Sequence, residues 1–155
     1  MALEAPISKF TRTNLKIYIF LCIAVAAWFA YDGYLNKTFI EKNTNENGAP
    51  NITLIVNQKL PPFLVAAAVL LSVYLFAVRN KKLIADENEL VFSDKEKIPY
   101  DSIQSINKTY FEKKGFFVIT HKDENGKEIN RKLSDRKYEN ENLAAILDHL
   151  VAKIS

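Results

Sequence analysis

The feature that constrains this chain most is an apolar run in its middle, LPPFLVAAAVLLSVYLFAVRNKK, which spans residues 60–82. Nearly every side chain from residue 63 to residue 78 is apolar, and the run ends in Arg79, Lys81 and Lys82. An α-helix rises about 1.5 Å per residue, so roughly 20 apolar residues cross the hydrocarbon core of a bilayer. The run is therefore long enough to cross a membrane as one helix.

This run predicts a transmembrane helix over residues 60–79. Pro61 and Pro62 suit the first turn of such a helix, because the N–H groups that proline lacks have no helical partner there. The basic cluster at the other end is typical of the cytoplasmic edge of a span. We expect the three basic side chains of that cluster to contact the membrane surface, where each is attracted to anionic lipid.

A second apolar run, residues 17–31, predicts another transmembrane helix over residues 17–35. Aromatic residues such as Trp28 lie near its ends, where amphipathic rings prefer the membrane interface. Residues 1–16 are polar and basic and are expected to form a short cytoplasmic segment. A cleaved signal peptide is the alternative, because small residues at 25–27 resemble a cleavage site. The aromatic cluster directly after that site favours an uncleaved anchor.

The two runs are separated by a neutral loop, residues 36–59, whereas both outer flanks of the helix pair are basic. The positive-inside bias therefore places both termini in the cytoplasm and the loop on the other side. Residues 37–40 and 51–57 have the composition of β-strands, and a turn-rich stretch lies between them. We expect these two segments to form a small external β-hairpin.

Small side chains in the two runs are expected to let the helices pack closely. The candidate helix–helix contacts are Ala26 and Ala30 in the first run and Ala67 and Ser72 in the second. Neither run carries a charged residue in its middle, although ion paths, proton relays and transport sites usually require one. The sequence thus argues against a channel, a pump or a transporter.

Residues 80–155 are predicted to form one cytoplasmic domain of antiparallel strands followed by a helix. Residues 82–85 and 89–92 make a hairpin pattern around an acidic turn. Residues 115–121 and 128–133 make a second hairpin, because the Asn-Gly pair between them is a strong turn signal. An amphipathic C-terminal helix follows, whose apolar stripe is formed by Leu143, Ile146, Leu147, Leu150, Val151 and Ile154.

The predicted domain shows none of the patterns that catalysis or metal binding requires. From residue 79 onward acidic and basic residues nearly balance, which argues against nucleic-acid binding. Cys22 is the only cysteine, and the chain contains no metal-ligand spacing, no phosphate-binding glycine loop and no nucleophile motif. We therefore expect no enzymatic activity, no metal, no cofactor and no small-molecule substrate.

Three basic pairs lie within this domain, at residues 113–114, 131–132 and 136–137. Each pair is interleaved with acidic residues, so the local charge is close to balanced. We interpret all three as parts of a solvated face. The basic edge at residues 79–82 remains the candidate for contact with lipid.

The last part of the chain resembles the bacterial pleckstrin-homology-like (PH-like) domains. The resemblance is carried by residues 83–90 (LIADENEL), by residues 98–106 (IPYDSIQSI) and by residues 138–150. It implies an α+β membrane protein in which a two-helix transmembrane hairpin precedes a small antiparallel PH-like β-barrel or sandwich, capped by a C-terminal helix. It also implies a multi-pass protein of the bacterial inner membrane. The acidic turn at residues 86–89 departs from the basic turn that binds phosphoinositides in eukaryotic relatives.

These observations favour a non-enzymatic, membrane-anchored interaction or scaffold protein. Its PH-like domain would be held against the cytoplasmic membrane face and would bind another membrane or cytoplasmic protein. One alternative is an accessory subunit that contacts a larger membrane enzyme or transport complex through the hairpin. A further alternative is recognition of anionic membrane lipids at the membrane surface.

Overall fold

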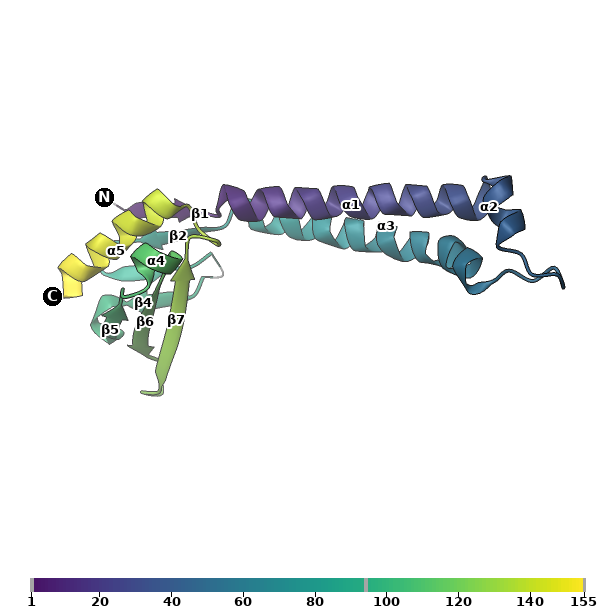
Figure 1. Cartoon of the computed structure of the whole chain (residues 1–155). Coiled ribbons are helices and arrows are strands. Elements are labelled where there is room, and N and C mark those ends of the chain that lie inside the picture. The colour runs from purple at the N-terminus through teal and green to yellow at the C-terminus, as the bar shows by residue number, and fades with distance from the viewer. Residues whose placement is uncertain (1, 94, 155) are drawn as a thin grey trace. The chain divides into compact units, whose positions relative to one another are not determined.

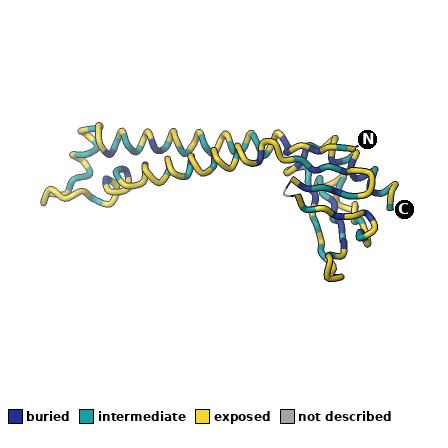
Figure 2. Tube along the Cα trace, turned by 180° about the vertical axis from the view of Figure 1, so that it is seen from behind, coloured by how far each residue is buried: buried dark blue, intermediate teal, exposed yellow. Residues whose placement is uncertain are grey.

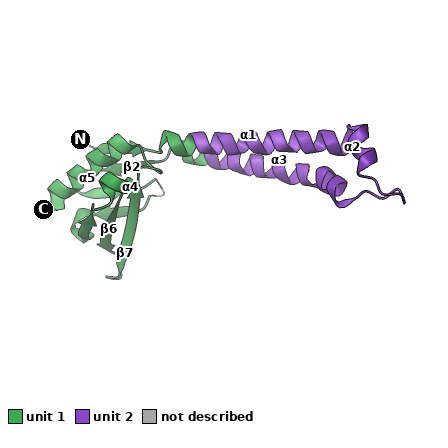
Figure 3. Cartoon of the chain, in the orientation of Figure 1, with its two compact units in different colours: residues 1–12, 77–155 green, residues 13–76 purple. Residues whose placement is uncertain are grey.

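The computed structural model describes residues 2–93 and 95–154, and Figure 1 shows the order of its helices and strands. The chain divides into two compact units (Figure 3). Unit 1 contains residues 1–12 and 77–155, and unit 2 contains residues 13–76. Unit 1 is an α+β domain built from both ends of the chain, whereas unit 2 is mainly helical.

The strands of unit 1 form two antiparallel sheets, as the α+β prediction required. Within each sheet the strands follow one another in chain order. In the described part of the chain, the first sheet contains β1 (Leu3–Pro6), β2 (Lys82–Ala85), β3 (Glu89–Val91) and β4 (Lys97–Pro99), and the second contains β5 (Ile103–Asn107), β6 (Phe116–Lys122) and β7 (Glu128–Ser134).

The two sheets do not close into a barrel, so of the two predicted forms, a barrel or a sandwich, the barrel was wrong. Among residues 2–93 and 95–154, no strand of one sheet pairs with a strand of the other. The first sheet ends at Pro99, which lacks the N–H group needed to extend the hydrogen-bond ladder. A single 3₁₀ turn, η1 (Tyr100–Ser102), then leads the chain into the second sheet.

The N-terminal segment, predicted only as a short cytoplasmic segment over residues 1–16, contains a strand and the start of a helix. Residues 3–6 form β1, which pairs antiparallel with β2 in the register Leu3 to Ala85 and Pro6 to Lys82. Helix α1 (Lys9–Tyr34) begins almost at once, well before the apolar run. The domain therefore takes its first strand from residues that precede both long helices, and its boundary is not at residue 80.

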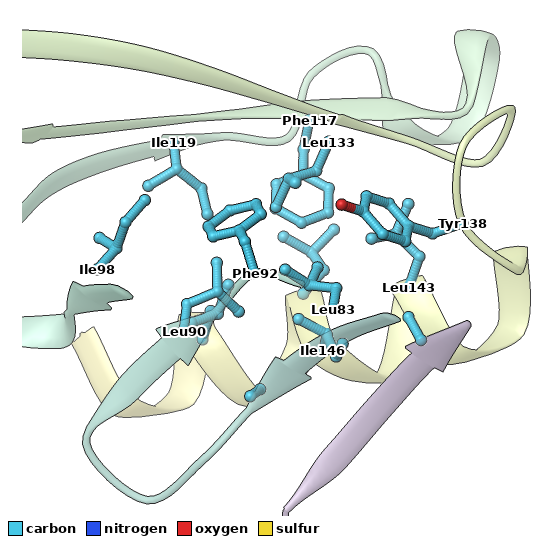
Figure 4. Close-up of a cluster of buried hydrophobic side chains, with 14 of the residues drawn as sticks. Leu83, Leu90, Phe92, Ile98, Phe117, Ile119, Leu133, Tyr138, Leu143 and Ile146 are labelled. Atoms are coloured by element: carbon cyan, nitrogen blue, oxygen red, sulfur yellow. The ribbon is translucent and has the colours of Figure 1, made fainter. Parts of the chain in front are cut away.

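One hydrophobic core fills unit 1 (Figure 4). Residues alternate in and out along β6, so Phe117 and Ile119 are fully buried. Helix α5 (Asn140–Ile154) adds the predicted stripe, with its first four members buried and Val151 and Ile154 packed at the margin. Ala5 and Ile7 belong to the same core, so the N-terminal strand contributes apolar packing as well as backbone pairing.

Both hairpins predicted within the domain are present. β2 pairs with β3, and β6 pairs with β7 over its whole length. Gly126 in the turn between β6 and β7 has φ +78°, a conformation that glycine adopts without a steric penalty. A single helical turn, α4 (Phe111–Lys114), connects β5 to β6.

Unit 2 consists mainly of two long apolar helices, α1 and α3 (Ile52–Val78). Both are long and apolar enough to cross a membrane. Much of both helices is exposed (Figure 2). Large apolar side chains are among the exposed residues, and examples are Phe20, Phe63 and Leu70. An exposed apolar surface of this extent is not typical of a water-soluble helix pair.

Helix α3 begins earlier than the predicted residue 60, so Pro61 and Pro62 lie inside the helix and not in its first turn. The start at Ile52 follows from a cap, because the Asn51 side chain accepts a hydrogen bond from the N–H of Leu54 at 3.0 Å. The two prolines therefore remove two helical N–H donors from the middle of the helix.

The predicted external β-hairpin is absent from the described loop. Residues 37–42 form α2 (Lys37–Lys42), and residues 52–57 are the start of α3. The side chain of Asn36 caps α2 by accepting a hydrogen bond from the N–H of Phe39 at 3.2 Å. Asparagine caps and continuity with the apolar helix outweigh the strand propensity of the β-branched residues at 52–56.

Candidate functional site

The two long helices are inserted between two paired strands of unit 1. β1 leads into α1 through residues 7–8, and α3 leads into β2 through residues 79–81. The N–H of Ile7 donates to the carbonyl of Lys81 at 3.2 Å, beyond the last strand pair. The chain therefore leaves the domain and returns to it at neighbouring points, through two very short connections.

The first turn of α1 is capped by the domain itself. Ser8, the residue before α1, caps the helix, because its side-chain oxygen accepts a hydrogen bond from the N–H of Thr11 at 3.2 Å. The Lys9 N–H donates to a Glu139 carboxylate oxygen at 2.8 Å, at the positive end of the helix dipole. The hydroxyl groups of Ser8 and Thr11 both donate to the carbonyl of Arg136. The loop between β7 and α5 is thus fixed to the start of α1.

An open pocket of about 620 Å³ lies beside this first turn. Phe10 of α1, which is 60% exposed, and Phe111 of α4 supply its aromatic lining. Lys113, Lys114 and Arg136 supply three cationic side chains. The pocket therefore combines exposed aromatic rings with positive charge, and we call it the Phe10 pocket.

The part of the Phe10 pocket that is lined by Gly115 and Asp135 depends on the conformation of the glycine. Gly115 has φ +65°, and its N–H donates to the carbonyl of Phe111 at 2.8 Å. The N–H of Asp135 donates to the Gly115 carbonyl at 2.8 Å, and a Cβ at Gly115 would overlap the Asp135 carboxylate. Glu112 and Asp135 thus place two carboxylates in the same lining as the three cations.

The sequence interpretation did not find the Phe10 pocket. It assigned residues 113–114 and 136–137 to a solvated face and did not single out Phe10 or Phe111. Only the fold brings these residues together, because they come from α1, α4 and the loop before α5. The one available signal was Phe10 itself, an aromatic residue between Lys9 and Arg12 in an otherwise polar segment.

The three predicted membrane-surface contacts differ in their exposure and pairing. Arg79 and Lys81 are exposed. The Lys82 ammonium group lies 2.5 Å from a carboxylate oxygen of Glu4 on β1. This pair lies at the surface and adds little stability, but it balances the charge of Lys82. The contact of residues 79–82 with the membrane surface stays a prediction.

The four predicted helix–helix residues fall into different environments. Ala26 is buried, and Ala30 and Ala67 are half-buried. Ser72 is exposed, and its hydroxyl donates to the carbonyl of Ala68 in its own helix at 2.7 Å. The buried small residue of α3 is Ala68.

A polar contact joins α1 and α3 where Pro62 leaves a helical carbonyl without its usual donor. That carbonyl belongs to Gln58, and it accepts a hydrogen bond from the Tyr34 hydroxyl at 2.8 Å. In return, the Gln58 side-chain amide donates to the carbonyl of Gly33, near the end of α1, at 3.0 Å. A Cβ on Gly33 would lie 2.9 Å from the backbone of Asn57, so only glycine permits this close approach.

Comparison of the chain with protein-family models, curated proteins and solved structures gave no match. The geometry around the Phe10 pocket and the two long helices therefore carries the functional argument. Among residues 2–93 and 95–154, no group of three or more His, Cys, Asp or Glu side chains is placed to hold a metal ion.

The acidic turn after β2 changes the ionisation of two neighbouring groups. The hydroxyl of Tyr100 donates to the carbonyl of Asp86 at 2.7 Å. Burial, together with the charges of Asp86 and Glu89, raises the pKa of Tyr100 to about 12. The hydrogen bond to Glu89 at 2.6 Å and its negative charge raise the pKa of Lys97.

Tyr100→Phe is expected to flatten the alkaline pH dependence of domain stability. Tyrosine in the unfolded chain ionises near pH 10, whereas in the folded state it ionises only near pH 12. Its contribution to stability is therefore complete below about pH 10 and is lost as the pH rises toward 12. Urea unfolding of both proteins at pH 7 and pH 11 measures this pH dependence. At pH 7 the variant should also be about 1 kcal/mol less stable, because it lacks the hydrogen bond from the Tyr100 hydroxyl. If both proteins lost the same stability between pH 7 and pH 11, the raised pKa assigned to Tyr100 would be contradicted.

Proposed function

We propose that this chain is a membrane-anchored, non-enzymatic interaction protein. In this proposal α1 and α3 cross a bacterial cytoplasmic membrane as a hairpin, and unit 1 is a PH-like domain at the cytoplasmic face. A four-stranded and a three-stranded sheet with a C-terminal helix support the PH-like assignment. The observation that carries the proposal is the insertion of the hairpin between the paired strands β1 and β2.

This insertion has a mechanical consequence for an anchored domain. A domain on a single flexible linker samples many orientations, because even a few free residues span several ångströms. Here both connections are short, and the first turn of α1 is hydrogen-bonded to residues 136–139 of the domain. An anchor of this kind holds a domain close to the bilayer and limits the faces that it can present.

A cation–aromatic surface on the domain is the proposed contact for a protein partner. The rings of Tyr110 and Phe116 are stacked with their centroids 5.4 Å apart, and Tyr110 is 43% exposed. Lys114 lies 5.0 Å from the centre of the Tyr110 ring, and Lys132 lies 3.8 Å from that of Phe116. Exposed tyrosines in such settings are enriched at protein interfaces. The positive charge favours a partner with an acidic surface.

Single-cysteine labelling tests the topology, because Cys22 is the only cysteine of the chain. In a Cys22→Ser background, Glu46→Cys places a thiol in the exposed turn between α2 and α3, and Glu124→Cys places one in the exposed turn between β6 and β7. A membrane-impermeant maleimide should label residue 46 in intact cells and residue 124 only after permeabilisation. Tyr110→Cys, carrying a photo-crosslinker, should give a discrete protein adduct in native membranes.

Two results would contradict the proposal. Equal labelling of residues 46 and 124 in intact cells would rule out a spanning hairpin with a cytoplasmic domain. Crosslinking from residue 110 only to lipid, with labelling as expected, would leave the anchor in place but would exclude the proposed protein contact.

A further inference from the structure

We propose that the outer edge of β7 binds an acidic, extended segment of a partner protein as an added β-strand. This inference rests on the proposed function, because it specifies how a protein partner would engage the cation–aromatic surface. Lys132 belongs both to that surface and to β7, so a strand added to β7 continues the same contact.

β7 lacks the features that usually protect the edge of a sheet from strand addition. Natural edge strands are kept short, are interrupted by proline or a bulge, or are covered by another element. In the described part of the chain, β1 and β4 each end in proline, and the carbonyl of Pro6 on β1 also accepts the N–H of Glu139. β5 carries a register shift between Ile103 and Ser105. β7 is seven residues long, contains neither proline nor glycine, and pairs with β6 without a shift.

The hydrogen bonds of the hairpin show which backbone groups of β7 face this edge. The carbonyl of Lys127 accepts a backbone hydrogen bond at 2.9 Å just before β7, and the N–H of Asp135 donates one at 2.8 Å just after it, both across the hairpin. Every second residue of an antiparallel strand bonds to a given neighbour, so the odd-numbered residues of β7 bond to β6. The N–H and carbonyl groups of Glu128, Asn130 and Lys132 therefore point to the outer edge, where no other strand among residues 2–93 and 95–154 pairs with β7.

Two of these three residues direct their side chains toward β6 and not across the outer edge. The side-chain oxygen of Asn130 accepts a hydrogen bond from the hydroxyl of Thr120 on β6 at 2.7 Å. The ammonium group of Lys132 lies 3.8 Å from the centre of the Phe116 ring, which is also on β6. The outward backbone groups of Asn130 and Lys132 are therefore open to an added strand.

The charge at one end of this edge favours an acidic partner. A residue opposite Lys132 in an added strand would have its Cβ about 5 Å away on the same face of the sheet, so a carboxylate there would pair with the ammonium group. Lys114, 5.0 Å from the centre of the Tyr110 ring, adds a second positive charge beside the stacked rings. Glu128 lies at the other end of β7, roughly 13 Å along the strand.

Peptide binding to the full-length protein tests the inference. The protein is purified in a non-ionic detergent, and the binding of fluorescein-labelled peptides is measured by fluorescence anisotropy. The probe is a peptide in which glutamate alternates with valine. One matched peptide has lysine in place of glutamate, and a second has every backbone nitrogen methylated, so that it cannot donate to a strand. We expect the glutamate peptide to bind and each matched peptide to bind about ten-fold more weakly.

A proline at residue 130 tests the backbone contact separately from the side chains. Asn130→Pro removes one outward N–H and leaves the ladder to β6 intact, because proline is tolerated where the N–H faces away from the neighbouring strand. It should weaken binding of the glutamate peptide about five-fold. Asn130→Ala is the matched control, because it also loses the bond to Thr120 but keeps the N–H, and it should bind like the unmodified protein.

Lys132→Glu provides a second test that leaves every backbone group in place. Reversal of this charge should reverse the preference, so that the lysine peptide binds more tightly than the glutamate peptide. An unchanged preference would show that the charge of Lys132 does not select the partner.

Several outcomes would overturn the inference. These are no binding of the glutamate peptide, equal binding of the methylated peptide, or equal binding by the Asn130→Pro and Asn130→Ala proteins. Dimers that form without peptide and are lost only in Asn130→Pro would mean that a second copy occupies the edge. Crosslinking from residue 110 in native membranes does not require strand addition. A protein adduct there, together with any of these outcomes, would remove the added strand and leave the proposed function in place.

Discussion

A chain in which the dipeptide Asn-Gly replaces residues 8–80 is expected to fold as a soluble domain, whereas residues 80–154 alone are expected to remain unfolded. β1 and β2 are antiparallel and Pro6 lies opposite Lys82, so Ile7 and Lys81 are positioned to flank a two-residue turn. Asn-Gly is the preferred sequence for such a turn. The shortened chain would keep both sheets, the core and α5.

Loss of β1 is expected to be severe because the strand contributes both core and hydrogen bonds. Ala5 is fully buried and Ile7 is 3% exposed. The N–H of Glu139 donates to the carbonyl of Pro6 at 3.0 Å, and the Asn142 side chain donates to that of Glu4 at 2.9 Å. At roughly 1.5–3 kcal/mol for a buried isoleucine and about 1 kcal/mol per hydrogen bond, the loss is about 5 kcal/mol or more. That is comparable to the whole stability of a small domain.

Urea unfolding followed by circular dichroism compares the two chains. The joined chain should show one cooperative transition, and the chain of residues 80–154 should show none. Replacement of Ala5 and Ile7 by aspartate in the joined chain keeps its length and should abolish the transition. Cooperative unfolding of residues 80–154 alone would show that β1 is dispensable.

Gly33→Val is expected to destabilise the helix pair by about 2–3 kcal/mol. The added Cβ would meet the Asn57 backbone at 2.9 Å, so the helices must separate locally. Separation would also break the two hydrogen bonds that join Gln58 to Tyr34 and Gly33. The carbonyl that Pro62 leaves without a helical donor would then lose the hydrogen bond from Tyr34 as well.

Fluorescence of Trp28, the only tryptophan, reports on this unit directly. Unfolding by titration of sodium dodecyl sulfate into a mild detergent should shift to a lower midpoint in the Gly33→Val protein. Ala27→Val is the matched control, because residue 27 is exposed on the same helix. The same midpoint in both variants would mean that the close approach at Gly33 is unimportant for stability.

Local patterns of the sequence were sufficient where neighbouring residues decide the structure. The Asn-Gly turn and the alternation around it predicted β6 and β7, and the apolar stripe predicted α5. The two long apolar helices followed from composition and length alone. In each case the deciding contacts lie within one hairpin or one helix face.

Local patterns misled where two signals competed within a short segment. Residues 52–56 are rich in β-branched side chains and indicated a strand, yet Asn51 caps a helix there. Pro61 and Pro62 indicated a helix start, yet the helix passes through them and Tyr34 supplies the missing hydrogen bond to Gln58. The first outcome depended on a cap that lies next to the segment, and the second involves Tyr34 of α1, which is 24 residues away from Gln58.

Composition and periodicity by themselves determined that the chain has two long apolar helices and a small domain of strands followed by one helix. Only the tertiary structure decided that residues 3–6 are the first strand of that domain and that Phe10 lies beside Lys113 and Arg136. The physical reason is that β1 is short, ends in a proline and lies at a sheet edge, so its own residues carry almost no strand signal. Its pairing depends on β2, which the chain reaches only after both long helices.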